Sequence, residues 1–343
     1  MQRPYFLGID VASVSVDVAV IDAETLDVLD AEYIRHNGRP MQVATDAIRT
    51  SLDKHGPADL KGLSATGSGG RVVAEVLGVG FVNEVVAQAA ATMKLYPRAN
   101  TIIEIGGDDS KLITLKAPDA EGKREIADFA MNTLCAAGTG SFLDKQASRL
   151  SLSIEQFGEL GAQVDDPPRV AGRCSVFAKS DMIHLQQKGT PTRAIVAGVC
   201  HALVRNFRST VAAATELQAP ISFQGGVAAN AGIVKAVAKV LGLGEDELIV
   251  PEHFGCMGAI GAVLKAVETG DIRMPELGKL EELAVYEDVS GEVPLEPLSL
   301  ETSRIMDSEI VRPQPALGEK MPAYLGIDVG SISTNLVVID SDG

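Results

Sequence analysis

Short apolar runs typical of β-strands open the chain, and segments with apolar positions at helical spacing follow them. The same order then returns in the second half. In the first half we expect strands at 5–11, 16–22, 27–35 and 61–66, and helices at 40–54, 70–78 and 84–96. In the second half we expect strands at 101–107, 110–117, 123–132 and 221–226, and helices at 136–150, 154–162, 175–188, 191–216, 229–242 and 255–269. Two such units predict an α/β protein with two lobes, mixed sheets and a ligand cleft between the lobes.

Part of the chain is repeated. Residues 4–22 read PYFLGIDVASVSVDVAVID, and residues 322–340 read PAYLGIDVGSISTNLVVID, a similarity typical of tandem domains. The second copy holds only about one hairpin, which buries too little surface to be stable alone. We therefore expect lobe I at 1–95 with a closing helix at 255–270, lobe II at 96–254, a Glu- and Pro-rich linker at 271–321, and the truncated start of a second repeat at 322–343. A strand that folds back onto its own domain is the alternative.

Charge and cysteine content exclude several classes of binding partner and of structural role. The net charge is −16 and there is no basic run, which argues against nucleic acid and against an anionic membrane surface. The longest apolar stretch, at 194–204, is far too short to span a bilayer, and we expect a cytoplasmic protein. Four cysteines are too few for a disulfide scaffold in a chain of 343 residues. They are metal ligands, redox groups or packing residues.

Three glycine-bearing loops follow strand ends. They read GIDVASVS at 8–15, EIGGDDSK at 104–111 and FQGGVAANAGIV at 223–234. Small residues let backbone N–H groups approach phosphate oxygens, a carboxylate at a strand end can hold Mg²⁺ through waters, and glycines at a helix N-terminus leave room for a base or ribose. In this order the loops resemble the phosphate-1, phosphate-2 and adenosine motifs of the actin, sugar-kinase and heat-shock-chaperone ATPase superfamily. The resemblance implies an actin-like ATPase fold, with ATP or ADP bound between two ribonuclease-H-like lobes.

Two cysteines, Cys135 and Cys174, each precede a helical run. Helix N-termini supply oriented N–H groups that favour an anionic iron–sulfur cluster, and they lower the pKa of a thiol. Two thiolates cannot complete a site that needs four, so a second copy or the second repeat would have to supply the others. Packing is the alternative for both residues, and we read Cys200 and Cys256 as packing cysteines.

Five segments carry a closer resemblance. They read MNTLCAAGTGSFLD, RCSVFAKSDMIHLQQKG, EIGGDDSK, QGGVAANAGI and GCMGAIGAVL, and the likeness runs over about 5–270. Together they resemble the activator ATPases of 2-hydroxyacyl-CoA dehydratases and the related benzoyl-CoA reductase ATPase subunits. The resemblance implies a single [4Fe–4S] cluster at a dimer interface, with Cys135 and Cys174 of each chain as ligands. It further implies ATP-driven transfer of low-potential electrons from a donor such as ferredoxin or flavodoxin to an acyl-CoA dehydratase-type partner enzyme.

The loops and the resemblance assign roles to individual residues. Asp10 and Glu104 would organise Mg²⁺ and water, and Glu84 would help to position the attacking water, with an ordinary helix-surface role as its alternative. The expected contacts to the phosphates come from Ser13, Ser15, Gly106, Gly107 and Ser110. The same loops contribute Gly8, Ala12, Val14 and Asp108 to the expected nucleotide-binding site. Gly225, Gly226 and Asn230 would flank the adenosine.

Four positions depart from the family pattern. Ala12 replaces a glycine, Asp17 a lysine, Glu104 an aspartate and Asp108 a glutamine. Extra carboxylates near a triphosphate weaken its binding unless a cation offsets them. Two other functions therefore stay open: a small-molecule kinase of the N-acetylhexosamine type, which has no use for Cys135 and Cys174, and a degenerate repeat that only dimerises and scaffolds.

Overall fold

The computed structural model divides the chain into two compact units, Met1–Tyr286 and Glu287–Gly343. It describes residues 3–132, 138–172, 175–213, 215–286, 318, 320–330 and 333–340. Cys135 and Cys174 lie outside the described residues. Among the helices of the described ranges, none combines the length and the apolar character needed to cross a membrane.

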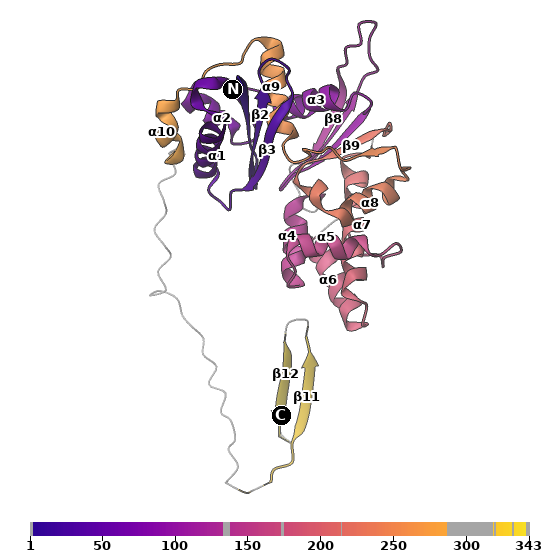
Figure 1. The fold of residues 1–343 in the computed structure, drawn as a ribbon. Coiled ribbons are helices and arrows are strands. Elements are labelled where there is room, and N and C mark those ends of the chain that lie inside the picture. The colour runs from indigo at the N-terminus through magenta and orange to yellow at the C-terminus, as the bar shows by residue number, and fades with distance from the viewer. Residues whose placement is uncertain are drawn as a thin grey trace. The chain divides into compact units, whose positions relative to one another are not determined.

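The first lobe is built on a mixed five-stranded sheet with the order β3-β2-β1-β4-β5. Its strands are β1 (Tyr5–Val11), β2 (Ser15–Asp22), β3 (Val28–Arg35), β4 (Leu60–Thr66) and β5 (Gly80–Phe81). Because successive side chains of a strand face opposite ways, Leu7 and Ile9 pack against Ile48 on one face while Gly8 faces Ala259 on the other. Helices α1 (Pro40–His55) and α2 (Gly70–Leu77) cover the first face, and α9 (Met257–Thr269) covers the second (Figure 1). A short 3₁₀ turn, η1 (Pro57–Asp59), leads into β4.

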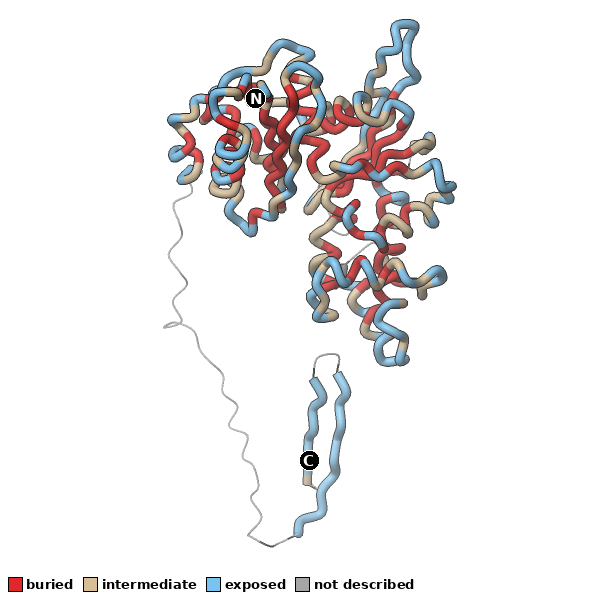
Figure 2. The backbone as a smooth tube through the Cα atoms, viewed as in Figure 1, coloured by how far each residue is buried: buried red, intermediate tan, exposed pale blue. Residues whose placement is uncertain are grey.

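The second lobe repeats the plan with the order β10-β9-β6-β7-β8. Its strands are β6 (Thr101–Ile105), β7 (Ser110–Leu115), β8 (Ile126–Asn132), β9 (Ile221–Gln224) and β10 (Leu248–Ile249). Its helices are α4 (Gly140–Arg149), α5 (Ile154–Ala162), α6 (Ser175–Gln187), α7 (Thr192–Thr210), η3 (Gly226–Ala229) and α8 (Ala231–Leu241). The core joins Phe142, Phe157, Phe207 and Phe223, each at most 1% exposed. Figure 2 shows a separate buried core in each lobe.

Helix α3 (Glu84–Leu95) belongs to both cores. Val85 and Ala89 pack on Ile102 and Ile113 of the second sheet, whereas Ala91 packs with α9 and the first sheet. At Gly261 the two helices meet so closely that a Cβ there would lie 1.7 Å from the carbonyl oxygen of Ala87. The glycine therefore allows direct contact between the backbones of α3 and α9.

Residues 271–286 are part of lobe I, so the expected linker at 271–321 starts too early. Arg273 forms a β-bridge with Leu63, and 3₁₀ helix η4 (Leu277–Lys279) leads into α10 (Leu280–Ala284). Leu280 and Leu283 are buried in the core that α1 and α2 share. The sequence gives little warning, because two apolar anchors on a five-residue helix are too few to show a helical period. Residues 287–317 lie outside the described ranges.

The second unit contains a hairpin of β11 (Tyr324–Val329) and β12 (Thr334–Ile339). Tyr324 pairs with Ile339, as Phe6 pairs with Ile21 in the first hairpin. The two copies thus share one register, which supports the proposal that 322–343 starts a second repeat. The apolar side chains of β11 and β12 are exposed in this unit, with Leu336 at 66% and Val338 at 67%.

Candidate functional site

Two adjoining cavities occupy the cleft between the lobes. The larger measures about 430 Å³ and the smaller about 220 Å³. Tyr33, Gly106, Gly107 and Gly226 line both cavities. The cleft is therefore continuous, with the two glycine loops at the junction.

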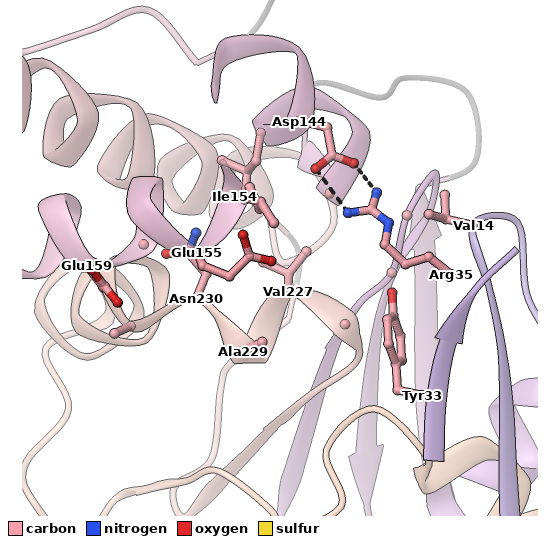
Figure 3. Close-up of a pocket in the computed structure, with 17 residues that line it drawn as sticks. Val14, Tyr33, Arg35, Asp144, Ile154, Glu155, Glu159, Val227, Ala229 and Asn230 are labelled. Atoms are coloured by element: carbon pink, nitrogen blue, oxygen red, sulfur yellow. Dashed lines mark hydrogen bonds and ion pairs between the residues drawn. The ribbon is translucent and has the colours of Figure 1, made fainter. Parts of the chain in front are cut away.

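The larger cavity is mostly apolar with a polar margin (Figure 3). Its apolar walls include Val14, Leu143, Ile154 and Val227, and its margin includes Arg35, Asp144, Glu155, Glu159 and Asn230. Asn230 caps α8, because its Oδ1 accepts a hydrogen bond from the N–H of Ile233 at 3.0 Å. A Cβ at Gly158 would lie 3.1 Å from the side chain of Asn230, so this glycine lets α5 approach the cap. An apolar slot with a few polar groups at its edge suits a nucleoside.

The smaller cavity lies between two phosphate-loop candidates. The N–H of Ala12 donates to the carbonyl of Ser15 at 2.9 Å, and the N–H of Gly106 donates to that of Asp109 at 3.1 Å, so each loop is a tight turn. The loops touch at Gly107, where a Cβ would lie 2.2 Å from Cγ2 of Val14. Only a glycine fits there without moving one loop away from the other.

A buried lysine stands among carboxylates at the floor of the smaller cavity. Nζ of Lys111 lies 2.8 Å from Oε2 of Glu104, 2.8 Å from Oδ2 of Asp109 and 3.3 Å from Oε2 of Glu84. Burial alone would lower the pKa of Lys111, but the three carboxylates outweigh burial and raise it. Lys111 is therefore a permanent cation that offsets part of the negative charge in the cleft.

Asp10 and Glu104 are buried beside this lysine. Burial raises the pKa of Asp10 and that of Glu104 to about 7, against the opposing charge of Lys111. One lysine does not compensate the carboxylates that face the cavity. A further cation bound there would favour their ionised forms.

Asp17 adds another buried carboxylate, 3% exposed. Its Oδ2 accepts a hydrogen bond from Oγ of Ser15 at 3.4 Å, and its Oδ1 has no hydrogen-bond partner among the described residues. Burial raises the pKa of Asp17 well above its ordinary value, and the charge of Asp10 raises it further. A buried oxygen without a donor, in a cavity with other carboxylates, fits the hard oxygen ligands that Mg²⁺ prefers.

Most of the site residues expected from the sequence do meet in this cleft. Those that line the smaller cavity are Asp10, Ala12, Ser13, Ser15, Glu84, Glu104, Gly106, Gly107, Asp108, Gly225 and Gly226. Val14 and Asn230 line the larger one. Cys135 and Cys174 lie outside the described residues.

Two residues expected to bind the nucleotide do not line the cavities that the described residues form. Gly8 lines neither cavity, and a Cβ there would lie 2.1 Å from the carbonyl oxygen of Ala259, so this glycine serves the packing of α9 on β1. Ser110 is fully buried in β7 and also lines neither cavity. A glycine or serine beside a phosphate loop looks the same in the sequence whichever way it faces.

Several residues that line the cleft were not predicted from the sequence. Lys111 and Asp109 stand in the quoted loop EIGGDDSK, in which a single lysine follows several acidic residues. The structure places Glu104 opposite Lys111 on β6 and β7. Tyr33 and Arg35 come from β3, which reaches the cleft only because it is the edge strand beyond β2. Nothing local in the sequence marks those two residues.

The chain is similar in sequence to a known family of ATPases. A model of the BadF/BadG/BcrA/BcrD ATPase family matches residues 7–266. The activator of lactoyl-CoA dehydratase from Anaerotignum propionicum is 35% identical over 268 residues, which cover 77% of this chain and 98% of that protein.

Two solved structures are similar in fold. Component A of (R)-2-hydroxyglutaryl-CoA dehydratase from Acidaminococcus fermentans has a TM-score of 0.69 and 28% identity, covering 77% of this chain and 98% of that chain. The activator of the 2-hydroxyisocaproyl-CoA dehydratase from Clostridium difficile, with bound ADPNP, has a TM-score of 0.66 and 26% identity, covering 83% and 99%. The predicted two-lobed, actin-like fold is confirmed.

Proposed function

This chain belongs to the BadF/BadG/BcrA/BcrD ATPase family, and we propose that it is an ATP-hydrolysing activator that passes low-potential electrons through a shared [4Fe–4S] cluster to a 2-hydroxyacyl-CoA dehydratase or a related partner enzyme. The observation that carries the proposal is the continuous cleft. A slot sized for a nucleoside opens onto two phosphate-loop candidates and a set of buried carboxylates. A nucleoside triphosphate with its bound cation has the same order of parts: a nucleoside, then phosphates, then a metal ion.

ATP or ADP would lie with its adenosine in the larger cavity, beside Gly226 and Asn230. Its phosphates would pass between the loops at 12–15 and 106–108, whose backbone N–H groups and hydroxyls suit phosphate oxygens. The terminal phosphate would then face Asp10 and Glu104. Phosphoryl transfer needs mainly positioning and charge stabilisation, with water as the nucleophile.

The residues present fit Mg²⁺. Asp10 and Glu104 would hold the ion, largely through waters, and it would neutralise charge on the phosphate oxygens. Asp17 offers a further oxygen without a donor among the described residues. Lys111 balances Glu104 and Asp109, and Glu84, 3.3 Å from Lys111, would help to orient the attacking water.

The cluster would use Cys135 and Cys174. The other two cysteines are poor ligands, because a ligand must be a thiolate and burial raises the pKa of Cys200 to about 12 and raises that of Cys256 as well. Two thiolates per chain require two more from a second copy, or from the second repeat. Val176 and Phe177, directly after the Cys174 segment, are 64% and 65% exposed, which supports a protein interface at this point.

The partners follow from this chemistry and from the relatives. An electron donor such as ferredoxin or flavodoxin would reduce the cluster, and nucleotide turnover would drive delivery of the electron to the partner enzyme. The relatives are named as activators of lactoyl-CoA and 2-hydroxyisocaproyl-CoA dehydratases. We therefore propose an acyl-CoA dehydratase-type enzyme as the recipient.

One observation favours a second candidate, a repeat that binds nucleotide without turning it over. Asp17 puts a buried carboxylate opposite Asp10, where it opposes the charge of a triphosphate. Steady-state ATPase activity of the purified chain separates the candidates. Robust turnover excludes the scaffolding role.

Iron and sulfide content of anaerobically purified protein tests the main proposal. We expect a visible iron–sulfur absorption band and four irons per dimer, as a [4Fe–4S] cluster requires. Cys135→Ala and Cys174→Ala should each lose the iron, whereas Cys200→Ala, at a buried packing position, should keep it. Full iron in Cys135→Ala would contradict the ligand assignment, whereas a wild-type chain without iron would favour a kinase of the same superfamily.

A further inference from the structure

The first turn of α4 is tied to the second phosphate-loop candidate. The N–H of Gly140 donates to the carbonyl of Gly106 at 2.8 Å, and the N–H of Ser141 donates to that of Gly107 at 2.8 Å. Oγ of Ser141 also donates to Oδ1 of Asp108 at 2.6 Å. A shift of this loop is therefore passed directly to α4.

The middle of α4 is tied to the other lobe. Arg35 is the last residue of β3 in lobe I, and Asp144 lies in α4 of lobe II. Nη1 of Arg35 lies 3.4 Å from Oδ1 of Asp144, and Nη2 contacts Oδ2, so the pair is bidentate. Figure 3 shows this ion pair at the edge of the larger cavity, which both side chains line.

We propose that the Arg35–Asp144 ion pair is a latch, which holds the two lobes together over a bound nucleotide and fixes α4 in one position. The proposal rests on the nucleotide site proposed above. Opening the cleft separates β3 from α4 and breaks the pair, whereas closing it restores the bidentate contact. Because α4 begins at Gly140, five positions after Cys135, the latch also sets the position of the helix that follows the Cys135 segment.

The strength of the pair suits a contact that opens in each cycle. The side chains of Arg35 and Asp144 are 41% and 35% exposed. Ion pairs of this exposure stabilise a contact only weakly, although bidentate geometry places a pair at the upper end of the range. Loss of the latch should therefore accelerate nucleotide release by roughly two- to fivefold.

Nucleotide release measures the latch directly. A fluorescent N-methylanthraniloyl ADP is bound to the full chain and displaced with excess ADP in a stopped-flow experiment. Arg35→Ala and Asp144→Ala should each release it roughly two- to fivefold faster, and the double variant should release it no faster than either single variant. The exchanged pair, Arg35→Asp with Asp144→Arg, should restore slow release.

A matched control comes from a second surface ion pair. Arg49 and Glu281 also form a close pair, but both lie in lobe I and line neither cavity. Arg49→Ala should therefore leave release unchanged. Additive effects of the two single substitutions, or an unchanged rate in Arg35→Ala, would overturn the latch. Failure of the wild-type chain to bind ADP would instead overturn the proposed nucleotide site.

Amide hydrogen exchange in α4 distinguishes a latch from a pair that only stabilises the fold, because only a latch would change the protection of α4 when ADP binds. Binding of ADP should slow amide exchange in the peptide that covers Gly140–Arg149. In Arg35→Ala at saturating ADP, this protection should fall even though the pocket is filled. Equal protection in the wild-type chain and in Arg35→Ala would overturn the link between the latch and α4.

Discussion

Asp10 and Asp17 lie directly opposite each other on the antiparallel strands β1 and β2, and both side chains are buried. Like charges in this relation destabilise a pair of strands. The second hairpin has the same register, but Asn335 stands opposite Asp328, and its Nδ2 donates to Oδ2 of that aspartate at 3.4 Å. The two copies thus differ by one negative charge at a position that faces the cleft in the first.

Replacing Asp17 with the residue of the second copy tests the effect of that charge. Asp17→Asn removes a carboxylate close to the expected phosphates, and we expect ADP and ATP to bind about tenfold more tightly, ~1.4 kcal/mol, in the absence of Mg²⁺ and at a pH where Asp17 is ionised. Calorimetric titration measures the change. Asp27→Asn, in an exposed loop of the same lobe, should have no effect. Equal affinities of Asp17→Asn and the wild-type chain would contradict the argument.

The stability of the nucleotide-free protein should fall as the pH rises from about 4 to about 7. Burial raises the pKa of Asp10 and that of Glu104 to about 7 in the folded chain, although Lys111 opposes both shifts. Unfolded carboxyls titrate near their ordinary pKa values of about 4. Asp17, whose pKa is raised by burial well above its ordinary value, acts in the same direction. In this window the folded state binds more protons at these buried carboxyls than the unfolded state, so their contribution to the free energy of unfolding decreases as the pH rises.

Urea titrations at several pH values measure this slope. Asp10→Asn removes one of these buried carboxyls and should flatten the curve, whereas Asp53→Asn, on the exposed side of α1, should keep it. The same slope in Asp10→Asn and the wild-type chain would refute the assignment.

Removing the buried cation should destabilise the second lobe. Lys111→Met leaves Glu104, Asp109 and Glu84 without their shared partner, and we expect a loss of about 3 kcal/mol in the free energy of unfolding. Lys116→Met is the matched control, because Lys116 pairs with Glu125 at the surface, where both side chains are more than half exposed. That change should cost less than about 1 kcal/mol. Similar losses in both variants would argue against a buried network.

Contact between the two phosphate loops should depend on Gly107. In Gly107→Ala the new methyl group overlaps Cγ2 of Val14, so the loops must separate, and we expect ADP affinity to drop about tenfold. Val14→Gly in the same chain removes both Cγ2 and Cβ, which would lie 2.2 Å and 2.7 Å from the new methyl group, and should restore most of the affinity. Gly278→Ala, where no atom lies within 4 Å, should leave binding unchanged. Unaltered affinity in Gly107→Ala would show that the loops can move apart without cost.

The segment that follows α9 should contribute to the stability of lobe I. Leu283 is fully buried, and Leu283→Ala should lower the free energy of unfolding by about 2–4 kcal/mol. Val285 is 75% exposed two residues later, and Val285→Ala should change stability by less than about 0.5 kcal/mol. Urea titration compares the two. Equal stability of both variants would indicate that residues 271–286 belong to the linker and not to lobe I.

Local periodicity was enough to predict the longer strands and helices of both lobes, but not the two-residue strands β5 and β10 or the five-residue helix α10. The strand expected at 16–22 is found at Ser15–Asp22, and the helix expected at 40–54 is found at Pro40–His55, because each has a clear apolar pattern. Any one glycine loop at a strand end is usually only a turn, but the three loops in their order predicted the position of the cleft. The prediction was weakest where a residue's direction mattered, as at Gly8 and Ser110.

Contacts between distant residues could not be predicted in the same way. Arg35 and Asp144 are 109 positions apart, and their contact depends on how the lobes sit against each other. The partners of Lys111 depend on the pairing register of β6 with β7 and on the placement of α3. Such contacts follow from tertiary packing, which a single sequence does not display.

The close approach of α3 to α9 at Gly261 and Ala87 has a mechanical consequence. Two backbones in direct contact leave no side chains that could be compressed or slide there, so we expect any rotation of the lobes to pivot at this point. A small rotation about a pivot produces displacements that grow with the length of the lever arm. Changes at the phosphates would therefore move the far ends of the lobes most. A bulky side chain at position 261 would push α3 and α9 apart and prevent this rotation.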